Sequence, residues 1–98
     1  MPKIRFAPVA AAHLKDLEER PDLAKRLKAV RSALGKLEVN PRHPGLKTHE
    51  YKGEKCPHGD KVFEAYAENQ TPAAYRLFWC YEPAERDVIL ILAITPHP

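Results

Sequence analysis

The run of residues that most constrains the fold is 88–94, whose sequence is VILILAI. Successive side chains of a strand point to opposite faces of its sheet, so a strand with one solvated face shows polar residues at alternate positions. Every position in this run is apolar. The run therefore predicts a central strand rather than an edge strand of a small sheet.

Two helices are predicted ahead of that strand. The first covers residues 8–20, begins at Pro8, which is favourable in a first helical turn, and carries an apolar stripe of Ala10, Leu14 and Leu17. After a break at Pro21, apolar residues recur at helical spacing and predict a buried seam, formed by Leu23, Leu27, Val30, Leu34 and Leu37. The short connection predicts a helical hairpin. The seam would also fit a coiled-coil dimer, but two heptads are too few to favour it.

The other predicted elements are short strands joined by turns. Residues 3–7 alternate, with Ile4 and Phe6 on a buried face. Prolines and a glycine at 41–45 exclude a helix there, and a short strand is expected around 46–52. Strands are also predicted for 61–68 and 73–81.

The strand at 73–81 has two different faces. Its larger face carries Tyr75, Leu77, Trp79 and Tyr81, and the opposite face carries Arg76, Phe78 and Cys80. The larger face is expected beneath the helices, with Trp79 buried. Arg76 and Phe78 are then expected on the open face of the sheet.

The predicted fold class is α+β, with an N-terminal strand, a helical hairpin and then a small, mostly antiparallel sheet. The 98 residues suit a single domain, 1–98, and 44% of them are hydrophobic and 30% charged, as in ordinary globular proteins. No apolar stretch approaches the roughly 20 residues of a membrane helix, and residues 1–6 do not resemble a signal peptide. We expect a cytoplasmic protein that does not enter a membrane.

The two cysteines, Cys56 and Cys80, do not form a disulfide framework. In a reducing cytoplasm both are expected to be free thiols. The sequence CPH at 56–58 resembles half of a metal site, but the sequence offers no second pair of ligands for it. No metal and no cofactor is therefore predicted.

Charge is unevenly distributed along the chain. Residues 1–55 hold 13 Lys/Arg and 7 Asp/Glu, which gives +6, whereas residues 56–98 hold 3 and 6, which gives −3. A basic half and an acidic half favour a surface that faces a polyanion. The alternative is that these basic side chains only solvate exposed helix faces.

The order of the elements and three segments resemble the RelE/ParE toxin superfamily of bacterial type II toxin–antitoxin systems. The segments are NPRHPGLKTHEYKG, AAYRLFWCY and AITPHP. The resemblance spans nearly the whole chain and implies a RelE-like fold. Relatives in the RelE branch cut messenger RNA without a metal, usually on the ribosome, by attack of a ribose 2′-hydroxyl on the adjacent phosphate.

The resemblance also implies roles for particular residues. Arg76 matches a strand arginine that would clamp the phosphate, which suits its planar, permanently charged fork. His97 matches a terminal histidine that would act as general acid or base, and His49 is the third catalytic candidate. The expected RNA-binding residues are Arg42, His43, Lys47 and Phe78.

Some positions depart from the family pattern and leave the activity open. Several cutting relatives have a glutamate before the Leu-Lys pair, and they often end in a tyrosine after the histidine, where this chain has Pro44–Gly45 and Pro98. The first hypothesis is a ribosome-dependent RNase toxin. The alternatives are a ParE-like toxin that inhibits DNA gyrase without catalysis and a non-toxic RNA-binding domain. A toxin implies a cognate antitoxin as partner, and the first hypothesis adds messenger RNA and the ribosome.

Overall fold

A computed structural model describes residues 2–85 and 87–96 of the chain. The helices are α1 (Pro8–Glu19) and α2 (Ala24–Val39), with short 3-10 turns η1 (Pro21–Leu23) and η2 (Pro44–Leu46). The strands are β1 (Lys3–Phe6), β2 (His49–Lys55), β3 (Lys61–Tyr66), β4 (Tyr75–Tyr81) and β5 (Val88–Pro96).

Across the described residues the strands form one five-stranded sheet in the order β1-β5-β4-β3-β2. β1 pairs with β5 in parallel, and the other three pairings are antiparallel. This confirms the expected α+β fold with a mostly antiparallel sheet. It also confirms that the apolar run in β5 forms a central strand, because β5 lies between β1 and β4.

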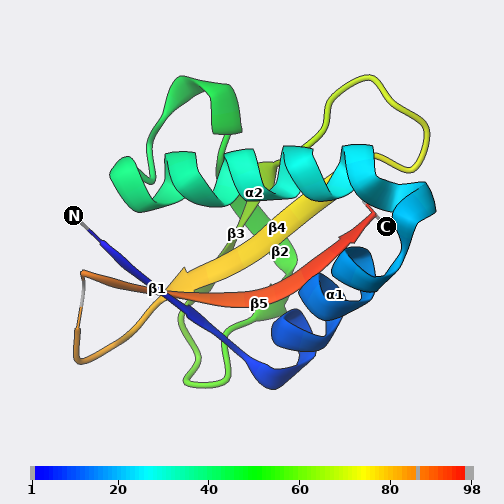
Figure 1. Ribbon diagram of the computed structural model, residues 1–98. Helices are drawn as coiled ribbons and strands as arrows, with labels where there is room; N and C mark the ends of the chain where they lie inside the picture. The colour runs from blue at the N-terminus through cyan, green and yellow to red at the C-terminus, as the bar shows by residue number, and fades with distance from the viewer. Residues whose placement is uncertain (1, 86, 97–98) are drawn as a thin grey trace.

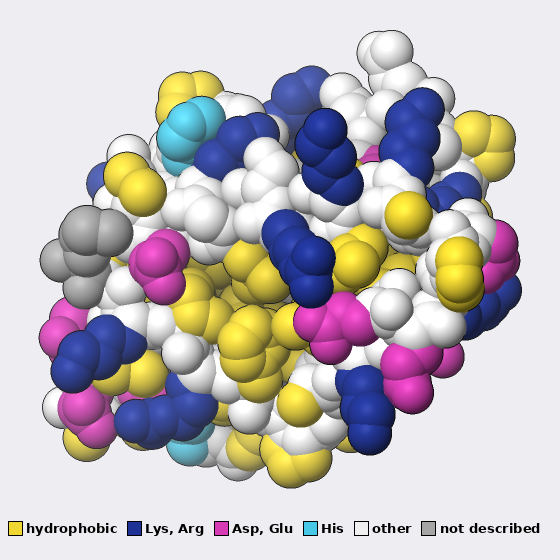
Figure 2. Space-filling view, viewed as in Figure 1, with side chains coloured by type: hydrophobic (Ala, Val, Ile, Leu, Met, Phe, Trp, Pro, Cys, Tyr) yellow, Lys and Arg dark blue, Asp and Glu magenta, His cyan; other side chains and the backbone are white. Residues whose placement is uncertain are grey.

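Both helices lie on the same face of the sheet (Figure 1), with α1 against β5 and α2 against β4. The core between the layers includes Val30, Ala33 and Leu37 of α2, all at most 2% exposed. Trp79 of β4 is 1% exposed, which confirms its predicted burial under the helices. Figure 2 shows hydrophobic side chains gathered in the middle of this side, below α2, with Lys and Arg side chains along the helix above them.

The opposite face of the sheet, here called the open face, is not covered by either helix. A second apolar cluster lies on it, made by Cys56, Val62, Phe78 and Cys80. The two faces alternate along β4 as the sequence predicted, because strand side chains have a period of two.

The strand expected around 46–52 is placed differently in the structure. Residues Pro44–Leu46 form η2, and β2 begins only at His49 and continues to Lys55. Lys47 stands between them with a left-handed φ of 48°. Leu46, the last residue of η2, is fully buried in the main core, so this tight turn places it there before the strand begins.

Phe6 is also placed differently from the expectation. Ile4 packs against the main core, but Phe6 is 36% exposed. β1 is a four-residue edge strand, and Phe6 is its last residue. The edge of the sheet therefore leaves this ring only partly covered.

The expectation of two free thiols is wrong for this structure, in which Cys56 and Cys80 form a disulfide. The turn after β2 is closed by a hydrogen bond from Cys56 N to Asp60 O. It brings the Cα of Cys56 to 6.3 Å from that of Cys80 in β4. The two cysteines are separated by 24 residues, so only the strand pairing reveals their proximity.

Among the helices of the described residues, none is both long enough and apolar enough to cross a lipid bilayer.

Candidate active site

The side chains of His49, Glu64 and Arg76 meet on the open face because β2, β3 and β4 are in register. His49 of β2 is paired with Glu64 of β3, and Tyr66 of β3 is paired with Arg76 of β4. Directly paired residues in an antiparallel sheet point to the same face. The pairing therefore brings together residues that are up to 27 positions apart in the sequence.

Glu64 is the centre of this cluster. Its Oε1 lies 2.8 Å from Nε2 of His49, and its Oε2 lies 3.7 Å from Nε of Arg76. Glu64 is 1% exposed, whereas the side chain of His49 is 48% exposed. A buried carboxylate thus holds two groups that can be cationic, and one of them remains accessible to a ligand.

Both ring nitrogens of His49 face an oxygen atom. Nε2 lies 2.8 Å from Oε1 of Glu64, and Nδ1 lies 3.0 Å from the carbonyl oxygen of Lys47. The two contacts fix the ring between β3 and the segment before β2, while about half of the side chain, 48%, stays exposed.

Arg76 lies on the open face, as predicted, but its guanidinium is turned into the protein. Nη1 donates to the carbonyl oxygens of Glu68, at 2.6 Å, and Tyr75, at 3.3 Å. Its Cζ lies 3.8 Å from the centroid of the Tyr66 ring, a cation–π contact. Arg76 is 8% exposed, so it contributes a fixed, mostly desolvated positive charge.

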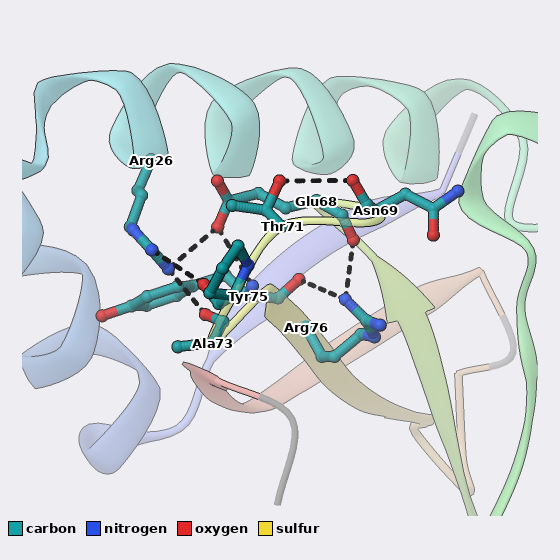
Figure 3. A network of polar contacts seen from close by, with 8 residues as sticks. Arg26, Glu68, Asn69, Thr71, Ala73, Tyr75 and Arg76 are labelled. Atoms are coloured by element: carbon teal, nitrogen blue, oxygen red, sulfur yellow. Dashed lines mark hydrogen bonds and ion pairs between the residues drawn. The ribbon is translucent and has the colours of Figure 1, made fainter.

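The loop that receives Arg76 is itself fixed to α2 (Figure 3). Arg26 of α2 donates to the carbonyl oxygens of Ala73 and Pro72, and its Nη1 lies 3.3 Å from Oε1 of Glu68. The same Glu68 oxygen accepts from the backbone N–H of Tyr75. Helix α2 therefore positions the β3–β4 loop, and that loop positions Arg76.

The predicted RNA-binding residues of the 41–48 segment lie apart from Arg76. Arg42, His43 and Lys47, together with His49, line a cavity of about 460 Å³. Its other walls include aromatic residues of the helix-covered face, Phe63, Trp79 and Tyr81. Arg42 and Lys47 are exposed, but Nδ1 of His43 accepts a hydrogen bond from the Gly45 N–H, so His43 serves as a cap of η2.

In the strand expected around 46–52, Lys47 and His49 would share one face, but β2 begins only at His49 and Lys47 lies outside it. Lys47 precedes β2 in a left-handed conformation, so strand alternation does not relate the two side chains. His49 is the residue that connects the two regions. It lines the cavity, and its ring contacts Glu64 on the open face.

Phe78 shares the open face with Arg76, as predicted, but it is not presented to solvent. It is 8% exposed, and its ring packs edge-on against Tyr51 with centroids 5.0 Å apart. Both rings border a hollow of about 440 Å³. Phe78 therefore acts as a packed aromatic residue in this structure.

His97 lies outside the described residues, so its role as general acid or base stays a prediction. Tyr66 is a site residue that the sequence analysis did not single out. Its alternation with Glu64 on β3 was visible, but its contact with Arg76 depends on the β3–β4 register.

Comparison with known proteins finds solved structures that share the fold of this chain. The YoeB dimer from Staphylococcus aureus superposes with a TM-score of 0.71, at 16% identity, over 99% of this chain and 98% of that one. The chain has the fold of a RelE/YoeB-type toxin. A copper-bound mutant toxin from Helicobacter pylori gives 0.62 at 16% identity, covering 99% and 96% of the two chains.

The intact RelBE toxin–antitoxin complex from E. coli contains a further match, with a TM-score of 0.60, 13% identity and coverage of 100% of this chain and 99% of that one. Comparison with protein-family models and with curated proteins gives no match. At such low identities the RelE/YoeB-type likeness is one of fold, and it confirms the predicted resemblance at that level.

Proposed function

We propose that this RelE/YoeB-type chain is a toxin that cleaves messenger RNA without a metal, on the ribosome. The observation that supports it best is the cluster of His49, Glu64 and Arg76 on the open face of the sheet. It combines an accessible proton donor with a fixed positive charge. These are two of the three groups that the reaction requires.

The proposed reaction is an in-line displacement at phosphorus. The ribose 2′-oxygen loses its proton to a base and bonds to the adjacent phosphorus, while the bond from phosphorus to the 5′-oxygen breaks. His49, as an imidazolium, gives its proton to the departing 5′-oxygen. The products are a 2′,3′-cyclic phosphate and a 5′-hydroxyl, so protons and electron pairs balance.

The remaining roles follow from charge and from the family resemblance. Arg76 stabilises the negative charge that develops on the phosphorane, because a preorganised charge costs little reorganisation during the reaction. His97, carried over from the resemblance, is proposed as the base. Arg42 and Lys47 are exposed cations beside His49, and we propose that they bind flanking phosphates.

A second function is favoured by the burial of Arg76. Its Nη1 is bonded to two backbone carbonyl oxygens, which fits a structural role as well as a catalytic one. In that case the chain would act as a non-catalytic, ParE-like inhibitor of DNA gyrase on the same fold. This alternative requires neither His49 nor His97 for toxicity.

The partner proposed for either toxin is a cognate antitoxin. The RelBE neighbour is a toxin–antitoxin complex, and residues 1–55 of this chain carry an excess of positive charge. Complementary charge across an interface speeds association and selects partners. An antitoxin with an acidic segment is therefore the proposed type of partner.

The experiment that tests the proposal is induction of the chain in bacteria, with mapping of new RNA 5′ ends on translated messages. Cleavage supports the RNase proposal. Growth arrest with double-strand DNA breaks and intact messages would instead favour the gyrase alternative.

Single substitutions then test the assigned roles. His49→Gln and His97→Gln should each lower the cleavage rate by ~10²–10⁴-fold, because neither glutamine can transfer a proton. Lys28→Gln, at an exposed position on α2, is the matched control and should cleave normally. Full cleavage by folded His49→Gln protein would remove His49 from the mechanism.

A further inference from the structure

Three side chains able to bind a metal meet at the other end of the open face. They are Cys56, His58 and Cys80, and one ligand atom from each lies within 4.8 Å of the other two. Cys80 is four residues from Arg76 on β4, or roughly 13 Å along a strand. This cluster is therefore separate from the candidate active site.

We propose that, in the reduced protein, Cys56, His58 and Cys80 bind one Zn²⁺ ion, and that oxidation of the two cysteines to the disulfide releases it. The disulfide in the structure corresponds to the oxidised, metal-free form. Two thiolates and one imidazole form a ligand set suited to Zn²⁺, with a water completing four-coordination.

The fold holds these ligands close in a small, fixed turn. Cys56 N donates to Asp60 O, and Gly59, with a positive φ of 91°, donates to Cys56 O. The turn therefore presents Cys56 and His58 together over Cys80, which is fully buried in β4. Because β4 is a rigid inner strand, the site has one fixed ligand and two ligands from one turn.

The ring of His58 already has the outer contacts that a zinc-bound histidine requires. Both ring nitrogens lie near Sγ of Cys56, Nδ1 at 3.4 Å and Nε2 at 3.3 Å, and Nε2 also lies 3.1 Å from the carbonyl oxygen of Tyr81 and 3.6 Å from Oδ2 of Asp60. A metal-bound histidine usually donates its second N–H to a carbonyl or carboxylate oxygen. With Nδ1 on the metal, the Nε2–H would donate to Tyr81 O.

The spacing of the ligands fits zinc after a small adjustment. Zn–S bonds of ~2.3 Å and a Zn–N bond of ~2.0 Å place two tetrahedral ligand atoms roughly 3.5–3.8 Å apart. Sγ of Cys56 lies 3.4 Å from Nδ1 and 3.3 Å from Nε2 of His58, which is already close to that range. Only the two sulfur atoms need to separate once their bond is reduced, which side-chain rotation at a Cα–Cα distance of 6.3 Å allows.

The release step balances with a small disulfide, such as oxidised glutathione, as the oxidant. One cysteine thiolate attacks the small disulfide, forms a mixed disulfide and expels one thiolate. The second cysteine thiolate then attacks the mixed disulfide, closes the Cys56–Cys80 bond and expels the second thiolate. Two electrons pass to the oxidant, and Zn²⁺ leaves because two of its three protein ligands are lost.

The test uses the full-length chain, reduced and then titrated with Co²⁺ and Zn²⁺ in the absence of oxygen. The proposal expects one equivalent of Co²⁺ with thiolate-to-cobalt charge-transfer absorption, displaced by one equivalent of Zn²⁺. The oxidised chain should bind more weakly by over about two orders of magnitude, because it lacks both thiolates. Equal affinity in both forms would overturn the proposal.

One substitution and its control distinguish a metal site from a pair of thiols without a metal. His58→Gln should weaken binding by at least the roughly 10–100-fold that follows loss of an outer-shell partner, yet still form the disulfide. His43→Gln, at a histidine outside the cluster, is the matched control and should bind like the unsubstituted chain. If His58→Gln binds Zn²⁺ as tightly as the control, His58 is not a ligand and the proposed site is wrong.

The release is measured directly on the zinc-loaded chain. Addition of oxidised glutathione should free one Zn²⁺, detected by a coloured chelator, for each Cys56–Cys80 disulfide formed. Formation of the disulfide with the metal still bound would overturn the release step. Because both readouts are independent of RNA cleavage, failure of the RNase proposal would leave them unchanged.

Discussion

The two faces of the sheet are formed by alternate residues of the same strands, but they bury different kinds of side chain. On β4, Leu77 and Trp79 face the helices and are at most 1% exposed. Arg76 and Phe78 face the opposite way and are each 8% exposed, although no helix covers them. The covered face is buried by a second layer, whereas the open face buries its residues with neighbouring side chains of the sheet itself.

Stability accounts for the buried residues of the covered face but not for the buried charges of the open face. Burial of apolar surface on the covered face stabilises the fold by about 25 cal/mol per Å². A buried ion pair gives little net stability, because desolvation opposes its attraction. Glu64 and Arg76 are the charged residues that the described part of the chain buries. The proposed active site gives a reason for this pair, because the proposed reaction needs a fixed positive charge.

The largest expected effect comes from breaking that buried pair. Arg76→Met removes the buried cation beside the Glu64 carboxylate, and should lower the free energy of unfolding by up to about 3–5 kcal/mol. The double variant Glu64→Leu with Arg76→Met removes both charges and should recover most of that loss in urea denaturation. A double variant as unstable as the single one would show that the pair itself stabilises the fold.

On the covered face, Leu37→Ala should lower the free energy of unfolding by about 2–5 kcal/mol, because it leaves a cavity under α2. Leu37 is fully buried. The matched control is Val39→Ala on the same helix, where Val39 is 63% exposed, and it should change stability by less than about 0.5 kcal/mol. Similar losses for both would contradict the assigned orientation of α2.

A smaller effect is expected from the aromatic ring that faces Arg76. Tyr66→Leu should cost ~0.5–2 kcal/mol, because it removes the ring on which the guanidinium rests. Tyr66→Phe keeps the ring and should be closer to the unsubstituted chain in thermal melts. If the two variants melt together, the cation–π contact contributes nothing measurable.

The smallest effect is expected at the surface contact between the helices. Arg31 and Glu18 lie 2.9 Å apart, but their side chains are 59% and 43% exposed. A double-mutant cycle with Arg31→Gln and Glu18→Gln should give a coupling of about 0.2–1 kcal/mol that decreases with added salt. A coupling as large as that of Glu64 and Arg76 would remove the distinction between buried and exposed pairs.

Much of the fold could be predicted because it depends on local periodicity. The apolar run at 88–94 indicated a central strand, and the spacing of leucines in α2 indicated a buried seam. Alternation along β4 correctly separated Trp79 from Arg76. The predictions failed near 44–48, where burial of Leu46 produces a 3-10 turn and a left-handed Lys47 that no periodic pattern reports.

The sequence by itself thus determined which side chains share a face, since strand alternation and helical spacing are properties of single segments. Only the tertiary structure decided which faces meet. The register of β2, β3 and β4 brings His49 to Glu64 and Arg76 to Tyr66, and the turn at 56–60 brings Cys56 and His58 to Cys80. Register is set by turn geometry and by packing between segments, so neither cluster can be read from one segment alone.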